Sequence, residues 1–364
     1  MGRYDKDRFF KELAIRYCLA TQALPFLEVT VPNISNLSVT EGIDILTDID
    51  VLGLRDAQDG HLHRTIFDCK TTNKMSPINR AFWACGLMKY VNCNDAHVIL
   101  KSRAVHNHRI SALSINVDLH DESSFTELGR TFDIGFADDL HYQSSIDRWN
   151  SVHQSYVNNA WSEPIFLVAR NVTPLTDTPW ISFRKLIAEL RAARGYFDPL
   201  KDGHMAIFLD ALSSAFVLWS TLGRDIRRFY DPSLKREDFE MILRYYIWGG
   251  KETYLVRQQL REKLAKEEKD TTPLDLPEWK RLVAFVGIII SAPQDIFRCA
   301  HVCRELSIRF GTSPIEKFDN QLAKTLKANS RIRQFTLALA EYLILASGIP
   351  KDLGNSVEAF LLKS

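Results

Sequence analysis

The stretch IDILTDIDVLGLRDAQDGHLHRTIFDCK, residues 43–70, decides the fold of the first part of this chain. Apolar and polar side chains alternate over residues 43–52, and this period of two predicts a strand. Asp59-Gly60 is a strong hairpin-turn dipeptide, and a second strand is predicted over residues 65–70. The stretch therefore predicts two adjacent antiparallel strands.

Further elements are expected on both sides of this hairpin. Apolar residues at helical spacing predict a helix over residues 4–24, and an extended segment follows at residues 26–32. Ser76 and Pro77 fit the N-cap and first turn of a helix that runs to Val91. Two more strands are predicted after it, at residues 96–101 and 109–120.

The second part of the chain has helical periodicity throughout. With 364 residues, the chain exceeds the size at which a single core usually stops growing, so two domains are expected. We predict an α+β protein with a mixed-sheet domain at residues 1–125 and an all-helical domain at residues 139–364. Substrate positioning, oligomerisation and binding of a partner protein are the roles open to the helical domain, whose apolar segments 282–290 and 335–345 should be buried internally or in a dimer interface.

Composition restricts the kinds of function that the chain can have. Its net charge is +1 and 25% of its residues are charged, so neither a disordered chain nor a polyanion-binding tail is indicated. A site for nucleic acid must therefore be a local patch. The six cysteines lack zinc-finger spacing and are interpreted as reduced thiols. With a charged first segment and no predicted membrane span, a cytoplasmic protein without membrane contact is expected.

Three residues of the predicted hairpin are candidates for metal-dependent chemistry. Asp68 and Lys70 share one face of their strand, and the hairpin can bring the Asp50 carboxylate beside that of Asp68. Carboxylates that converge in this way can hold Mg²⁺ or Mn²⁺, the ions that assist hydrolysis of a phosphodiester. The Cys69 backbone carbonyl would be a further ligand, and Lys70 would polarise the attacking water or balance phosphate charge. The alternative is an ordinary hairpin with a solvated Asp and Lys on its outer face.

This pattern resembles the PD-(D/E)XK superfamily of restriction-endonuclease-like nucleases. The order of an acid, a hairpin, a D-x-K triplet, a helix and a strand is similar over roughly the first third of the chain. The resemblance implies that Asp50 and Asp68 bind the metal and that Lys70 assists catalysis. Ile49 stands where the superfamily has its name-giving proline, and Asp68 replaces the commoner glutamate.

Other residues are weaker candidates for the same site. Glu12, in the pair Glu12-Leu13, resembles an acidic residue that many superfamily members carry near the metal, and it could equally be a surface glutamate. Asp48 lies two residues before Asp50 on the same face of the strand, so it could support the metal ligands or bind the metal itself, or it could be a solvated acid at the end of the strand. Basic side chains that could contact phosphates, or could simply be solvated charges, are Lys74, Arg80, Lys101, Arg103 and Arg109.

The function expected from these residues is metal-dependent endonucleolytic cleavage of DNA, as in bacterial defence or restriction effectors. Two alternatives stay open: a nuclease of the same fold that acts on RNA, and a binding or scaffold module without turnover. Because Asp50 and Asp68 should repel each other, removing either one should leave the melting temperature of the metal-free protein unchanged or raise it.

Overall fold

The computed structural model describes residues 2–33, 45–57, 61–71, 75–136, 138–264 and 274–363. The predicted turn at Asp59-Gly60 and the first two residues of the strand predicted at 43–52 lie outside these ranges.

Within the described residues, five strands form one mixed sheet in the order β1-β2-β3-β4-β5. β1 pairs antiparallel with β2, β2 pairs antiparallel with β3, and β3, β4 and β5 run parallel to one another. Their bounds are β1 (Leu24–Pro32), β2 (Ile45–Asp56), β3 (Leu62–Lys70), β4 (Asp95–Leu100) and β5 (Val117–Asp121). The predicted hairpin is thus confirmed as β2 and β3, and the C-terminal ends of β3, β4 and β5 share one sheet edge.

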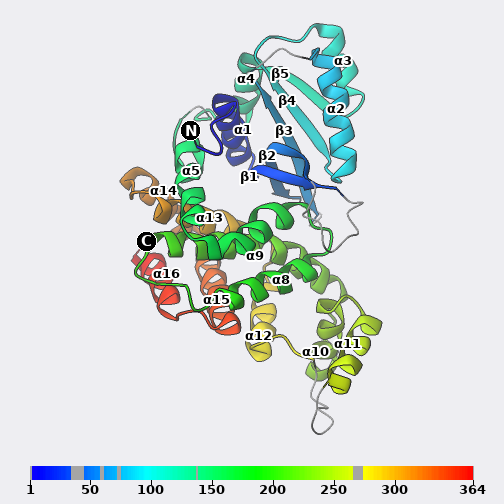
Figure 1. The fold of residues 1–364 in the computed structure, drawn as a ribbon, viewed down its shortest axis with the longest axis vertical. Helices are drawn as coiled ribbons and strands as arrows, with labels where there is room; N and C mark the ends of the chain where they lie inside the picture. Colours follow the sequence, from blue (N-terminus) through cyan, green and yellow to red (C-terminus); the bar gives the residue numbers. More distant parts are fainter. Residues whose placement is uncertain are drawn as a thin grey trace.

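Helices cover both faces of this sheet (Figure 1). One face packs against α1 (Arg8–Ala20) and α4 (Glu122–Phe132), and the other packs against α2 (Pro77–Tyr90) and α3 (His106–Leu113). α2 begins as the sequence predicts, because the Ser76 side chain accepts a hydrogen bond from the Asn79 backbone N–H at 3.3 Å.

Two predicted elements differ from the structure in their extent, and the helix α1 also differs in which of its side chains are buried. The strand predicted at residues 109–120 is wrong in its first half, where α3 forms instead, because a short apolar run does not distinguish a strand from a helix. The helix predicted at residues 4–24 is too long, since Gln22 adopts a left-handed conformation (φ 60°) in the turn that leads into β1. Phe9, one of the apolar residues whose helical spacing predicts this helix, is half-exposed, whereas Lys11 is buried.

The second part of the chain is helical, as predicted, and the protein is of the α+β class. In this part α9 (Asp202–Phe229) and α13 (Ile296–Gly311) pack against each other most extensively. The 18-residue window of α9 that is apolar enough to cross a membrane is 94% buried inside the protein, as in the core helix of a folded chain. The other helices are η1 (Tyr142–Ser144), α5 (Ile146–Val157), η2 (Ala160–Ser162), α6 (Glu163–Phe166), η3 (Leu167–Val172), α7 (Thr173–Leu175), α8 (Pro179–Ala192), α10 (Arg236–Ile247), α11 (Lys251–Leu264), α12 (Trp279–Ile289), η4 (Pro293–Asp295), α14 (Glu316–Ala328), α15 (Ser330–Ser347) and α16 (Asp352–Lys363).

The β1 edge of the sheet packs against this helical part (Figure 1). The Thr30 backbone N–H donates to the Asn171 side chain of η3 at 3.3 Å, and the Arg304 guanidinium of α13 lies over the Phe26 ring at 4.8 Å from its centroid. Buried apolar residues of both parts form one continuous cluster, which contains the apolar segments of α12 and α15. The division into two domains stays a prediction.

Candidate active site

The candidate site lies where the ladder between β2 and β3 ends. The last pair of this ladder is Val51 with Phe67, and the next residue of β2, Asp50, contacts β3 through its side chain. Asp50 Oδ2 accepts a hydrogen bond from the Cys69 backbone N–H at 2.8 Å. The side chain of Asp50 is therefore held at the end of β3, next to the D-x-K triplet.

The Lys70 ammonium bridges the two predicted metal-binding carboxylates. Lys70 Nζ donates to Asp50 Oδ2 at 2.7 Å and lies 3.3 Å from Asp68 Oδ1. Asp50 is only 4% exposed and Asp68 3%, so both carboxylates are buried. The alternative of a solvated Asp and Lys on an outer face does not describe this hairpin.

Arg80 of α2 closes the site from the next element of the chain. Its guanidinium donates to both carboxylate oxygens of Asp68, and its other side stacks on the Trp83 ring at 4.3 Å. From the sequence, Arg80 was a candidate for contacting phosphates or a solvated charge. In this structure it pairs with Asp68, and Lys70 is the cation that contacts both acids among the described residues.

Two further acids complete the cluster on the side of β1. Glu28 lies between Leu27 and Val29, whose partners on β2 are Val51 and Ile49, so Glu28 stands opposite Asp50. Glu28, Asp48 and Asp50 each offer an oxygen, and these oxygens lie within 4.8 Å of one another. This arrangement is suited to a cation with oxygen ligands.

The backbone of Glu28 is strained. Its φ of 49° is in the left-handed region, which costs energy for a residue with a side chain, and such outliers cluster at functional sites. In this conformation the Glu28 carboxylate forms an ion pair with the fully buried Lys11 ammonium of α1. Lys11 Nζ also lies 4.0 Å from Asp50 Oδ1.

The acids in this cluster compete for protons. Burial and a hydrogen bond with Asp48 raise the pKa of Glu28 to about 7, and the same hydrogen bond lowers the pKa of Asp48. Burial raises the pKa of Asp50, and the Lys70 charge opposes that shift. Burial alone would lower the pKa of Lys70, but Asp50 and Asp68 outweigh it and raise that pKa above its usual range. Lys70 is therefore a permanent cation here.

These contacts change the expectation that Asp50 and Asp68 repel each other in the metal-free protein. Asp68 faces Lys70 and Arg80, and Asp50 faces Lys70 and Lys11. Removal of Asp68 would leave Arg80 without its carboxylate partner and Lys70 with Asp50 alone. It should therefore lower the stability of the metal-free protein rather than raise it.

The remaining predicted residues lie in different places. Glu12 accepts a hydrogen bond from the Ile146 backbone N–H at 3.0 Å, in the first turn of α5, and no contact described in this structure joins it to Asp50 or Asp68. Lys101 and Arg103 are exposed just beyond the C-terminal end of β4, whose last residue, Leu100, pairs with Lys70. Lys74 lies outside the described residues.

Arg109 is not part of the acid cluster either. It lies on α3. Burial raises the pKa of Asp118 on β5 and lowers that of His120 to about 4, and the Arg109 charge has a smaller, lowering effect on both. Of the predicted basic residues that the structure describes, Lys101 and Arg103 thus remain candidates for contacting phosphates, because they are exposed and follow the strand end that pairs with Lys70.

Sequence reasoning missed Glu28 and Lys11, although each left a signal. Glu28 is the one charged residue in the strand LPFLEVTVP of β1. Lys11 shares its helical face with Ala14, Ile15 and Cys18, which are all buried. A charged residue at a core position of each of two neighbouring elements predicts that the two form a buried pair.

Comparisons with known proteins add no further assignment. No family model, no curated protein and no solved structure matches this chain.

Proposed function

We propose that this protein is a metal-dependent phosphodiesterase that cleaves nucleic acid, with DNA as the favoured substrate. The observation that carries the proposal is the buried convergence of Asp50 and Asp68 on the Lys70 ammonium at the end of the β2 and β3 hairpin. A buried acid with a perturbed pKa, as Asp50 is, that shares a cation with a second buried acid is typical of catalytic sites.

The order of elements supports a restriction-endonuclease-like core. An acid on β2, a D-x-K triplet on β3, the helix α2 and the strand β4 follow one another, and the sheet is mixed with helices on both faces. This order is the one on which the resemblance to PD-(D/E)XK nucleases rests. The five-stranded sheet itself is compatible with other functions.

The charge balance of the cluster favours a bound divalent cation. Among the described residues, the cluster holds the four carboxylates of Glu28, Asp48, Asp50 and Asp68 and the three cations Lys11, Lys70 and Arg80, and the pKa of Glu28 is about 7 because burial makes its charge unfavourable. A divalent cation would remove this penalty. Glu28 could then be ionised at neutral pH.

The residues present fit Mg²⁺ or Mn²⁺, which take oxygen ligands. Two ligand sets are possible, and Asp50 belongs to both. The resemblance implies Asp50, Asp68 and the Cys69 carbonyl, whereas the short distances between their oxygens favour Asp50, Glu28 and Asp48. Such a metal supplies Lewis acidity and a bound water of lowered pKa. Lys70 would balance the negative charge that develops on the phosphate at which cleavage occurs. Lys101 and Arg103 would contact neighbouring phosphates of the nucleic-acid strand.

Cleavage assays on the full chain test this function directly. Supercoiled, linear and single-stranded DNA and RNA are incubated with Mg²⁺, with Mn²⁺ and with EDTA. We expect cleavage of DNA that requires the metal. Cleavage of RNA alone would favour the RNA-cleaving alternative, and binding of nucleic acid without any cleavage would favour the scaffold alternative.

The raised pKa of Glu28 predicts opposite effects of pH on stability and on metal binding. Because the folded state holds this proton more tightly than the unfolded chain does, the contribution of Glu28 to stability is complete below pH 4.5 and is lost as the pH rises through about 7. Metal binding requires the ionised carboxylate, so affinity for Mn²⁺ should increase over the same range. Melting curves and Mn²⁺ titrations between about pH 5 and 8 measure both effects.

The variant Glu28→Gln should flatten both pH dependences and weaken Mn²⁺ binding. Glu358→Gln, at an exposed position of α16, is the matched control and should behave like the parent protein. A Glu28→Gln protein with the parent's pH dependence would show that Glu28 does not titrate in the cluster.

A further inference from the structure

A second group of metal-ligand side chains lies on the opposite face of the sheet from Asp68. Asp68 pairs in register with Val98, whereas His97 pairs with Phe67 and with Asp118. Because side chains alternate along a strand, His97 and Asp118 share the face that is covered by α1 and α4. His120, two residues after Asp118 on β5, lies on this face too.

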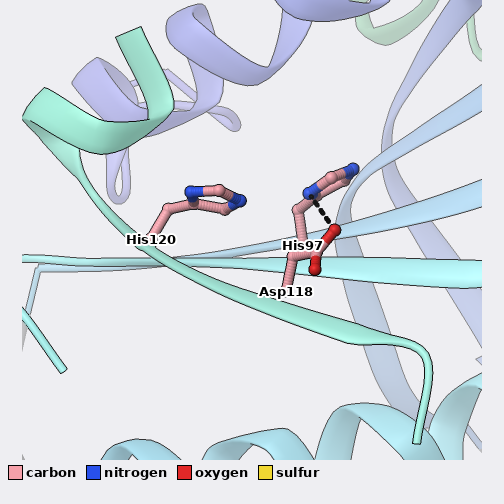
Figure 2. Close-up of side chains that lie close together, drawn as sticks. All are labelled: His97, Asp118 and His120. Carbon is pink, nitrogen blue, oxygen red and sulfur yellow. Dashed lines mark ion pairs between the residues drawn. The ribbon is translucent and has the colours of Figure 1, made fainter. Parts of the chain in front are cut away.

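The three side chains are close enough to share one ion. His97 Nδ1 lies 3.5 Å from Asp118 Oδ2, and one ligand atom from each of His97, Asp118 and His120 lies within 4.8 Å of the others. Figure 2 shows both imidazoles on one side of the strands, with a ring nitrogen of His120 pointing toward the His97 and Asp118 pair. In a tetrahedral site with bonds of about 2.0 to 2.1 Å, ligand atoms are roughly 3.3 Å apart.

Two buried ring nitrogens in this group have no hydrogen-bond partner in the part of the chain that the structure describes. His97 is only 6% exposed, and its Nδ1, like the buried Nε2 of His120, has no hydrogen-bond partner among the described residues. The 3.5 Å between His97 Nδ1 and Asp118 is within range of an ion pair but lacks the geometry of a hydrogen bond. Unsatisfied buried polar atoms are rare and call for an explanation such as a bound ion.

The surroundings of His120 support the same explanation. Its Nδ1 lies 3.4 Å from the Ser124 hydroxyl in the first turn of α4, which leaves Nε2 as the nitrogen aimed at the other two ligands. A ligating histidine usually has its second ring nitrogen hydrogen-bonded in this way, because that bond fixes the tautomer and the ring orientation.

Burial also keeps both imidazoles in the form that binds metals. It lowers the pKa of His97 and of His120 to about 4, so both rings are neutral at pH 7. The rings of Phe67, Tyr17 and Phe125 pack around His97 and shield it from water. The Asp118 side chain is 40% exposed, so an ion can reach the group from solvent.

We propose that His97, Asp118 and His120 form a site for a divalent transition metal, with Zn²⁺ as the ion that the donor set fits best. Two imidazoles and one carboxylate suit zinc, whereas Mg²⁺ prefers oxygen ligands alone. The site holds the ion with three protein ligands, and water completes the fourth position. It is separate from the acid cluster, and its existence does not depend on the proposed nuclease function.

Metal titration of the full chain tests the proposal. The protein is stripped with a chelator and titrated with Co²⁺, whose visible absorption distinguishes tetrahedral from octahedral coordination, and then with Zn²⁺ as competitor. We expect one equivalent of tetrahedral Co²⁺, its displacement by Zn²⁺, and a melting temperature that rises with the Zn²⁺ concentration.

Asp118→Asn and His120→Gln should each weaken this binding roughly 100-fold or more, since even the loss of an outer partner of a ligand costs 10- to 100-fold. His63→Gln is the matched control, because His63 lies on the same face of the sheet but contacts Asp95 at 3.6 Å instead. It should keep the parent's affinity. If His120→Gln does not fold, Asp118→Asn decides, since it changes a partly exposed side chain with little change of shape.

Asp50→Asn separates this proposal from that of the nuclease site. It should leave the tetrahedral Co²⁺ signal unchanged, whatever it does to cleavage. Absence of saturable tetrahedral binding, or the parent's affinity in both Asp118→Asn and His120→Gln, would overturn the proposal. So would a signal that Asp50→Asn removes and His120→Gln keeps, because the ion would then be in the acid cluster.

Discussion

Asp50→Ala, Asp68→Ala and Lys70→Ala should each reduce metal-dependent cleavage by roughly a thousandfold or more. The three side chains form one connected unit, in which Lys70 contacts Asp50 at 2.7 Å and Asp68 at 3.3 Å. The double variants should therefore cost little beyond the single ones, whereas independent surface charges would give small and additive effects. Initial rates of DNA cleavage with Mn²⁺ measure these losses.

Metal binding distinguishes the roles of the three residues. Lys70→Ala should still bind Mn²⁺, because it removes a cation and no ligand, whereas Asp50→Ala should lose most of that binding. In the metal-free protein, Asp68→Ala should lose stability on the order of 2 kcal/mol, because Arg80 loses its carboxylate partner and Lys70 loses one of its two.

Asp238→Asn is the matched control for these substitutions. It changes an exposed acid in the first turn of α10 and should cleave like the parent. Every variant is compared with a parent sample purified in parallel, so that a contaminating nuclease is recognised. Full activity in freshly purified Asp68→Ala would show that the catalytic site lies elsewhere.

Asp210→Ala should destabilise the whole protein by about 3 to 5 kcal/mol, the usual cost of breaking a buried ion pair from one side. Asp210 is fully buried on α9, between Arg170 at 2.7 Å and Arg304 at 3.1 Å, and it accepts a hydrogen bond from the Tyr156 hydroxyl. Burial opposes its charge, but the two arginines outweigh burial and lower the pKa of Asp210. Without the carboxylate, two buried guanidinium groups would repel each other.

This loss of stability should affect the sheet as well as the helices. Arg304 stacks over Phe26 of β1 and over Trp149 of α5, so the cluster joins the edge of the sheet to the helical part. Urea and thermal unfolding, followed by circular dichroism, measure the change in stability. Tyr156→Phe removes one hydrogen bond and should cost about 1 kcal/mol. A parent-like stability of Asp210→Ala would mean that the arginines find other partners.

The amino-acid sequence by itself determined the local parts of this structure. Alternation over β2 and β3, the Ser76 cap of α2 and the helical periodicity after residue 139 each depend on neighbours within a few positions, so each could be recognised in the chain. The two-residue spacing of Asp68 and Lys70 gave their common face for the same reason. The segment at residues 109–120 was misread because eight residues of α3 carry too few turns for their periodicity to be decisive.

Only the tertiary structure decided which charges meet. Glu28 and Lys11 join Asp50 because β1 pairs with β2 while α1 packs across the sheet, and Arg80 turns toward Asp68 because α2 covers the other face. His97 joins Asp118 and His120 through the parallel pairing of β4 with β5. These pairs are far apart along the chain, and their energy depends on burial, which periodicity in one segment does not reveal. The sequence could therefore name Asp50, Asp68 and Lys70, whereas the partners that neutralise them became visible only in the fold.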